Sequence, residues 1–178
     1  MFTFELITVF FIGLIFGSFA NVCIARLPKD KTIIFGRSNC PKCKKKISWY
    51  DNIPLISFIL LKGKCRQCNK KISINYFFVE LITGIFFILI YLYTNSYFDF
   101  VLINLILILF LIIFFIDLKH FIIPDILNFS LIFLGLLKNF IPTKNLNFNY
   151  DIEQSIIGGV VGYLTIWIII FLYKKLKN

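Results

Sequence analysis

Long uncharged apolar runs are the feature that most limits what this 178-residue chain can fold into. A helix that crosses a bilayer needs about 20 mostly apolar residues, with a range of about 17–25. Five runs near this length follow one another, at Leu6–Ala25, Tyr76–Leu92 (broken only by Glu80), Val101–Ile116, Ile126–Leu137 and Ile156–Tyr173. Only 16% of the residues are charged, and so small a chain could not bury five such helices in a soluble core. The sequence therefore predicts an all-α integral membrane protein with about five transmembrane helices, the fourth being the shortest.

The first apolar run is expected to remain in the mature protein as a helix. A secretory signal peptide begins with a basic segment ahead of its apolar core. Here the only early charge is Glu5, and the apolar run that follows is long. The pattern therefore favours a retained transmembrane helix over a cleaved leader.

Basic residues are concentrated in one segment of the chain. Of the 19 Lys and Arg residues, 13 lie between Arg26 and Lys71, against only Asp30 and Asp51. Because positively charged loops stay on the cytoplasmic side of a membrane, we expect this segment inside the cell and the N-terminus outside. Contact with the anionic lipid bilayer explains the net charge of +10 more simply than nucleic acid, which we do not expect as a partner.

Four cysteines in the basic segment form the clearest candidate site. Cys40 and Cys43 make one C-x-x-C, and Cys65 and Cys68 make another after 21 intervening residues. Four thiolates in two such pairs are the tetrahedral ligand set that structural Zn²⁺ prefers. Two disulfides are the rival interpretation, but the cytoplasm keeps thiols reduced. We therefore expect a small cytoplasmic zinc-binding loop domain between the first two helices, with Cys23 as a packing residue in the first helix.

Two aspartates flank the link between the third and fourth apolar runs, in the sequence DLKHFIIPD. Asp117 ends the third run, at a helix C-terminus where the macrodipole disfavours negative charge, so it is a functional candidate. Asp125 directly follows Pro124, and proline disfavours helix at the residue before it. A helix break at Pro124 and a capping role for Asp125 at the start of the fourth helix are therefore expected. His120 is expected to be an interfacial residue.

Several motifs, in one order along nearly the whole chain, resemble those of the prepilin peptidase (type IV leader peptidase) family of membrane aspartic proteases. The matching segments are GSFANVCIARLP (Gly17–Pro28), CPKC, WYDNIPLIS (Trp49–Ser57), CRQC, ISINYFFVELITG (Ile72–Gly84), DLKHFIIPD and the helix SIIGGVVGYLTIWIIIFLYKKL. Three residues depart from the family pattern: Ala20 replaces a larger apolar residue, Asn75 replaces arginine and Phe77 replaces proline. The resemblance implies an aspartic endopeptidase that removes the leaders of pilin-like precursors.

The resemblance also implies that Asp117 is the first of two catalytic aspartates. In the family the second belongs to a G-x-G-D motif shortly after the last of these helices, and these 178 residues contain no G-x-G-D. We therefore expect the chain to be truncated before the second motif. Because an aspartic protease divides acid and base roles between two carboxylates that share a proton, the chain alone is expected not to cleave.

Two domains and a second activity are further expectations from the resemblance. Residues 1–98 correspond to a methyltransferase-type region with the four-cysteine loop, and residues 99–178 to a partial aspartic peptidase membrane domain. The four-cysteine loop is typical of members that methylate the new N-terminal amine with S-adenosylmethionine, although no glycine-rich motif indicates the residues that bind this cofactor. The expected partners are prepilin or pseudopilin precursors, cleaved at the cytoplasmic face of a bacterial inner membrane.

A function of another class stays open on the residues alone. The chain could be a non-catalytic membrane scaffold, a degenerate paralogue that binds pilin precursors or assembly proteins without cutting them. A G-x-G-D encoded just downstream would favour the peptidase, and its absence would favour the scaffold.

Overall fold

The structure is a computed structural model of the 178-residue chain, and it describes all residues except 1, 34–35, 37, 141–151 and 178. The described residues form helices and loops, with no β-strand among them. In chain order the elements are α1 (Phe2–Arg26), η1 (Leu27–Lys29), η2 (Trp49–Asn52), α2 (Ile56–Leu60), α3 (Asn75–Tyr93), α4 (Tyr97–His120), α5 (Asp125–Phe140) and α6 (Ile152–Lys177). The all-α prediction is confirmed, as expected for segments whose backbone groups must pair internally in lipid.

Each of the five apolar runs forms one long helix, namely α1, α3, α4, α5 and α6. Within the described residues four helices are long and apolar enough to cross a membrane, at Phe2–Lys29, Asn75–Tyr93, Tyr97–His120 and Glu153–Lys175. Of the five long helices, the remaining one, α5, has 16 residues, just below the length of about 17 that a transmembrane helix requires. The prediction of about five helices therefore holds, and α5 is the short one.

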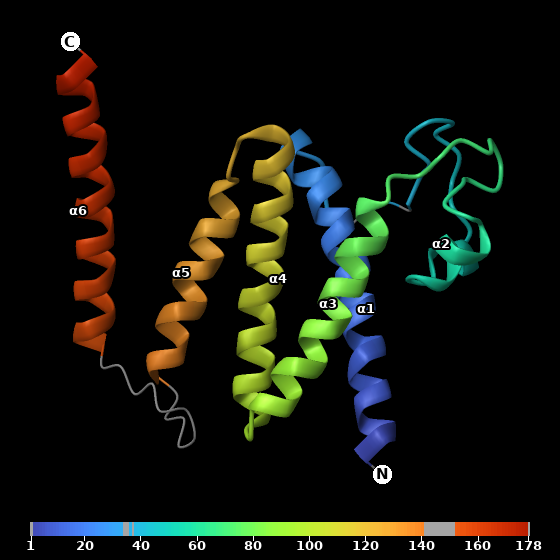
Figure 1. The fold of residues 1–178 in the computed structure, drawn as a ribbon, viewed down its shortest axis with the longest axis horizontal. Helices are drawn as coiled ribbons and strands as arrows, with labels where there is room; N and C mark the ends of the chain where they lie inside the picture. Colours follow the sequence, from blue (N-terminus) through green and yellow to red (C-terminus); the bar gives the residue numbers. More distant parts are fainter. Residues whose placement is uncertain (1, 34–35, 37, 141–151, 178) are drawn as a thin grey trace. The chain divides into compact units, whose positions relative to one another are not determined.

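The chain divides into two compact units, residues 1–131 and 132–178, which are described separately. In the first unit α1, α3 and α4 pack against one another, and the loop that carries the cysteines projects from one end of α1 and α3 (Figure 1). The second unit contains the end of α5 and the whole of α6. The four cysteines lie wholly within the first unit.

Glycines bring α1 and α3 into close contact. A Cβ atom placed on Gly13 would lie 2.8 Å from the Cα atom of Gly84, and one placed on Gly17 would lie 2.8 Å from the Cα atom of Glu80. No side chain fits at either distance, so the two helix backbones can approach this closely only where α1 carries glycine. Small residues four positions apart allow membrane helices to pack in this way.

The link between α4 and α5 contains both aspartates of DLKHFIIPD. α4 ends at His120 because Phe121 takes the left-handed backbone conformation, and its N–H bonds to the Asp117 carbonyl at 2.9 Å. The predicted break at Pro124 is confirmed. α5 begins at Asp125 itself, so this residue lies in the first turn of the helix rather than at the expected cap position before it. Its carboxylate still lies at the positive end of the helix dipole.

Candidate metal centre and adjacent pocket

The four-cysteine loop contains two turns of the same design. In the first, the N–H of Cys40 donates to the Lys45 carbonyl at 3.0 Å, and the N–H of Lys44 donates to the Cys40 carbonyl at 2.9 Å. In the second turn, the N–H of Cys65 donates to the Lys70 carbonyl at 3.0 Å, and the N–H of Asn69 donates to the Cys65 carbonyl at 2.9 Å. Lys44 and Asn69 occupy matching positions and both take the left-handed conformation, with φ of 59° and 54°. Each C-x-x-C therefore sits on a separate, backbone-bonded turn.

These two turns bring four cysteine sulfurs together, as the sequence predicts. The Sγ atoms of Cys40, Cys43, Cys65 and Cys68 lie within 4.8 Å of one another, and those of Cys40 and Cys68 are 3.9 Å apart. Four sulfurs bound to one zinc ion at about 2.3 Å would be about 3.8 Å apart, so the cluster has nearly the size of a tetrahedral site. All five cysteines are free thiols rather than disulfides, and Cys23 is buried in the helix core.

Backbone amides and neighbouring thiols shift the cysteine pKa values in opposite directions. The backbone N–H of Cys43 makes the largest contribution to lowering the pKa of the Cys40 thiol, which falls to about 6. The backbone N–H of Lys70 acts likewise on Cys68, but loss of water and hydrogen bonds with the other thiols outweigh it and raise the pKa of Cys68 to about 11. The lowered pKa of Cys40 favours its thiolate, which is the form that binds metal.

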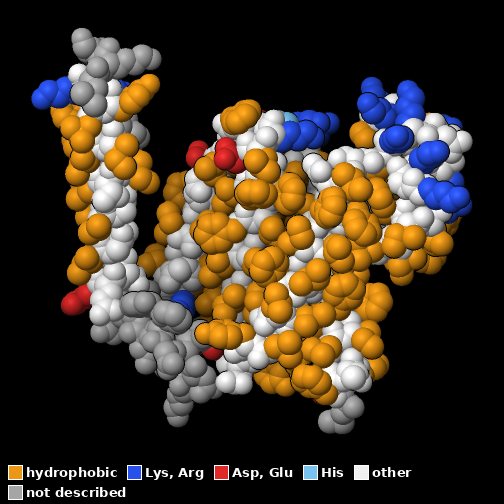
Figure 2. Space-filling view, viewed as in Figure 1, with side chains coloured by type: hydrophobic (Ala, Val, Ile, Leu, Met, Phe, Trp, Pro, Cys, Tyr) orange, Lys and Arg blue, Asp and Glu red, His pale blue; other side chains and the backbone are white. Residues whose placement is uncertain are grey.

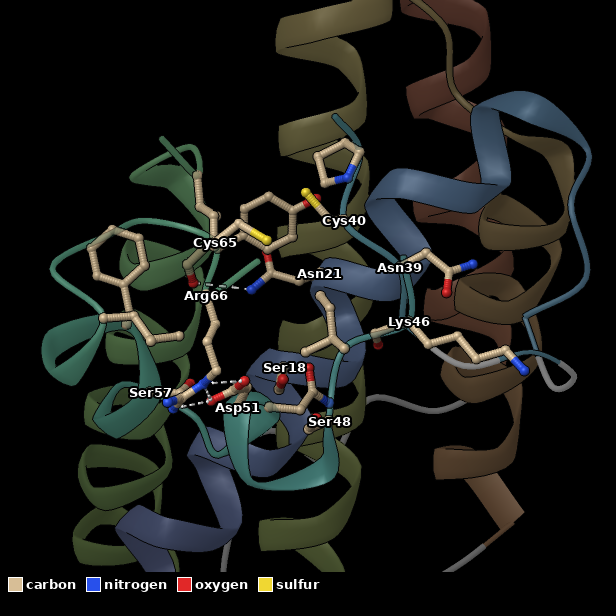
Figure 3. A pocket seen from close by; sticks show the side chains of 18 of the residues that line it. Ser18, Asn21, Asn39, Cys40, Lys46, Ser48, Asp51, Ser57, Cys65 and Arg66 are labelled. Carbon is tan, nitrogen blue, oxygen red and sulfur yellow. Dashed lines mark hydrogen bonds and ion pairs between the residues drawn. The ribbon is translucent and has the colours of Figure 1, made fainter. Parts of the chain in front are cut away.

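A pocket of about 300 Å³ lies beside the cysteine cluster. It is enclosed by the C-terminal half of α1, the four-cysteine loop and the first turns of α3 (Figure 3). Both polar and apolar side chains line it, among them Ser18, Asn21, Val22, Tyr50, Asp51, Phe58, Arg66, Tyr76 and Glu80. A cavity of this size with a few convergent polar groups is typical of a small-ligand site.

One ion pair holds the loop together at the edge of the pocket. The Arg66 guanidinium donates to both carboxylate oxygens of Asp51, at 2.7–3.1 Å (dashed lines in Figure 3). The same guanidinium lies 5.5 Å from the centre of the Tyr50 ring. A two-pronged Arg–carboxylate pair fixes orientation as well as distance. Because Asp51 is in η2 and Arg66 is in the second C-x-x-C, the pair joins two parts of the loop.

Glu80 is the acidic residue that a membrane helix contributes to the pocket, whereas Arg26 of α1 is a basic one. Glu80 lies in α3 and is only 9% exposed. Its Oε2 atom accepts the backbone N–H of Leu55 at 2.9 Å, and Ser18 and Asn21 of α1 line the same pocket. Leu55 has a φ of 57°, which a residue with a Cβ rarely adopts. The Glu80 carboxylate thus holds a strained turn of the loop against the helices.

The two aspartates of DLKHFIIPD do not contribute to this pocket. Asp117 is exposed in the last turn of α4, and Asp125 is exposed in the first turn of α5. His120, at the end of α4, is partly exposed. The first unit therefore presents two exposed carboxylates at helix ends and, apart from them, a partly open pocket beside the cysteines.

The pocket is the part of the site that the sequence does not predict. One feature of the sequence that could have indicated the pocket is Glu80, because an acidic residue inside a membrane helix is a functional candidate by default. Another is an internal repeat, C-x-x-C-x-K-K-I-S, at residues 40–48 and 65–73, which matches the paired turns. Neither signal indicates the pairing of Asp51 with Arg66, which depends on how the loop folds.

Fold and site together define a multi-pass α-helical membrane protein with a four-cysteine loop between its first two membrane helices. The model of the bacterial peptidase A24 N-terminal domain matches residues 11–94, and that of the type IV leader peptidase family matches residues 103–176. The chain belongs to the type IV leader peptidase family.

Three relatives illustrate the similarity, and each is named prepilin leader peptidase/N-methyltransferase. The one from Vibrio cholerae is 42% identical over 94% of this chain and 67% of its own length. Those from Klebsiella pneumoniae and Neisseria gonorrhoeae are 36% and 35% identical, over 95% and 94% of this chain and 75% and 65% of their own lengths. No solved structure gives a significant match. The relatives support prepilin leader peptidase as the function, with an aspartic mechanism consistent with the family, and do not favour the scaffold alternative.

Proposed function

We propose that this chain acts as a prepilin leader peptidase with a second, N-methyltransferase activity, in a bacterial inner membrane. The observation that carries the proposal is the 42% identity to the Vibrio cholerae relative across 94% of this chain. The substrates are prepilin or pseudopilin precursors, each with a short basic leader before an apolar helix. The leader is cut at the cytoplasmic face, with the N-terminus of the enzyme outside.

Asp117 is the proposed catalytic carboxylate of the peptidase. An aspartic protease needs two carboxylates that share a proton, because like charges a few Å apart cannot both ionise. One then acts as general base on the attacking water, and the other as general acid on the scissile carbonyl. The exposure of Asp117 in the last turn of α4 supports its access to water and substrate. Its partner is the aspartate of a G-x-G-D motif, which these 178 residues do not contain.

A structural zinc ion is the proposed occupant of the four-cysteine cluster. Four sulfur ligands make a closed tetrahedral site without an open position for catalysis. The mutual Sγ distances within 4.8 Å support this assignment. Metal binding would contribute folding free energy to a loop of residues 38–73 that has little apolar core of its own. In this proposal residues 1–98 form the methyltransferase-type region and residues 99–178 the peptidase region.

S-adenosylmethionine is the proposed methyl donor, and the pocket beside the cysteines is its proposed site. When bound, this cofactor supplies an activated methyl group. The residues present fit it, because a carboxylate complements its positive charge, and hydroxyl and aromatic side chains complement its sugar and base. Tyr50, Asp51 and Ser57 are the side chains of this kind contributed by the loop.

Processing of a prepilin tests the proposed function. The chain is extended by a family-type C-terminal segment that carries G-x-G-D and is expressed in bacterial membranes with a prepilin. We expect a gel shift from leader removal, and a mature N-terminus heavier by one methyl group in the mass spectrum. An intact leader on the precursor, with the extended enzyme correctly inserted in the membrane, would contradict the proposal.

A further inference from the structure

The pocket beside the four-cysteine cluster contains one carboxylate with no cationic partner in the described structure. The single ion pair among the described residues joins Arg66 to Asp51, and Glu80 takes no part in it. The carboxylate instead accepts a hydrogen bond from a neutral group, the Leu55 N–H. The Glu80 side chain is only 9% exposed, and it lies near the end of a membrane helix. A charged side chain in such a place costs free energy unless a partner compensates its charge.

The position of Glu80 limits which partner can reach it. Glu80 lies in the second turn of α3, beside the last turns of α1, where the membrane helices meet the four-cysteine loop. The pocket that Glu80 lines also contains apolar side chains, among them Val22 of α1 and Phe58 of α2. A ligand that pairs with this carboxylate therefore carries a cationic group next to an apolar body, and approaches at the level of the membrane surface.

We propose that Glu80 binds the N-terminal ammonium group of the mature peptide and takes up the proton that this group must lose before methylation, so that the pocket holds this end of the chain as an amine for methyl transfer. The inference rests on the proposed function, in which leader removal leaves an apolar helix that begins with a free amine at the membrane face. A carboxylate that is held by one neutral hydrogen bond can still accept a further, charge-assisted one. Glu80 is thus the residue that selects a peptide with a free N-terminus over its uncut precursor.

The variant Glu80→Gln removes the charge with little change in shape. The glutamine carbonyl oxygen can still accept the Leu55 N–H, so the turn of the loop remains attached to α3. Glu5→Gln is the matched control. Glu5 is also a carboxylate of a membrane helix and accepts a hydrogen bond at 2.9 Å from Tyr91, but it does not line the pocket.

The test compares two synthetic peptides of the same apolar sequence, one with a free N-terminus and one N-acetylated. Their Kd values are measured with the purified full chain in nanodiscs. We expect acetylation to weaken binding by about tenfold or more in the unmodified chain and in Glu5→Gln, because the ion pair is lost. In Glu80→Gln the two peptides should bind equally, while the metal content of the cysteine cluster is unchanged.

Several outcomes would overturn the inference. One is equal binding of the two peptides by the unmodified chain, a comparison that needs no variant to fold. Another is a preference for the free amine that persists in Glu80→Gln. The methyl donor carries an ammonium group too, so binding of S-adenosylhomocysteine is measured in parallel. Weaker binding of that probe to Glu80→Gln, with an unchanged peptide preference, would assign Glu80 to the donor instead.

The proposed function is tested separately from this inference. The C-terminally extended enzyme carrying Glu80→Gln should still remove the leader from a prepilin, because Asp117 is not part of the pocket. Leader removal without a preference for the free amine would refute only the role of Glu80. Failure of the extended enzyme with unmodified Glu80 to remove the leader would refute the proposed function itself.

Discussion

The backbone N–H of Leu55 donates a hydrogen bond to Oε2 of Glu80 at 2.9 Å, and this bond ties the four-cysteine loop to membrane helix α3. Leu55 also has a φ of 57°, a conformation that costs free energy unless its surroundings hold it. One buried carboxylate thus attaches the loop to the helices and, at the same time, lies in the wall of the pocket.

Glu80→Ala should destabilise the first unit by about 1–3 kcal/mol, because the Leu55 N–H would lose its partner in a part-buried position. Thermal unfolding in detergent, and the rate of proteolytic cleavage within residues 53–62, measure the effect. Glu80→Gln is the control and should stay close to the unmodified chain. Equal stability of the alanine and glutamine variants would mean that the hydrogen bond contributes nothing to attachment of the loop.

Gly17→Ala should separate α1 from α3 and cost about 1–3 kcal/mol, because the new methyl group would lie 2.8 Å from the Cα atom of Glu80. The nearest atom belongs to the α3 backbone and the next ones to the fully buried Thr83 side chain, so nothing close to the new methyl group can easily move away. Gly162→Ala in α6 is the control, since a Cβ there meets no described atom within 4 Å. The melting temperature should fall for the first variant only, and a fall of equal size in both would argue against the close contact.

The purified chain should contain one zinc ion per molecule, bound by Cys40, Cys43, Cys65 and Cys68. Cys40→Ser should greatly reduce the zinc content, whereas Cys23→Ser, in the helix core, should retain it. Elemental analysis of detergent-purified protein measures both. Removal of zinc by a chelator should also speed proteolysis of the loop, because the metal contributes to its folding free energy. A metal-free protein with four reactive thiols would rule out the zinc site.

Asp117→Asn should reduce leader cleavage by the C-terminally extended enzyme at least about 100-fold, because asparagine can neither take up nor release the shared proton. Asp125→Asn should do far less, since that carboxylate only adds a favourable charge of about 0.3–1 kcal/mol at the start of α5. Gel-shift processing of a prepilin compares the two. An equal loss in both variants would show that the carboxylate pair had been assigned to the wrong residues.

A reporter fused after Lys46 should be active in the cytoplasm, and one fused after Asn95 should be active outside. Basic residues surround Lys46, whereas residues 94–96, between α3 and α4, contain no basic side chain. Paired fusions to an alkaline phosphatase and to a fluorescent protein report the two sides. The reverse pattern would place Asp117 on the outer face, away from a leader that is cut inside the cell.

The sequence alone determined the membrane helices and the cysteine ligand set. In lipid a backbone can satisfy its hydrogen bonds only within a helix or a closed barrel, so an apolar run such as Val101–Ile116 had little alternative to α4. The four thiols were predictable for a similar reason, because two short C-x-x-C turns present paired sulfurs wherever they fold. The position of Asp117 at the end of α4 likewise follows from the end of an apolar run.

The pocket was decided only by tertiary structure. Its polar contacts join residues far apart in the chain: Asn21 donates to the Tyr76 carbonyl at 3.0 Å across 55 positions, and Leu55 meets Glu80 across 25. Such pairs form because α1 and α3 approach at Gly17, which brings the end of one helix to the beginning of the other. No local propensity encodes that approach, since it depends on which faces of two uniformly apolar helices pack together, and hydropathy alone does not distinguish between those faces.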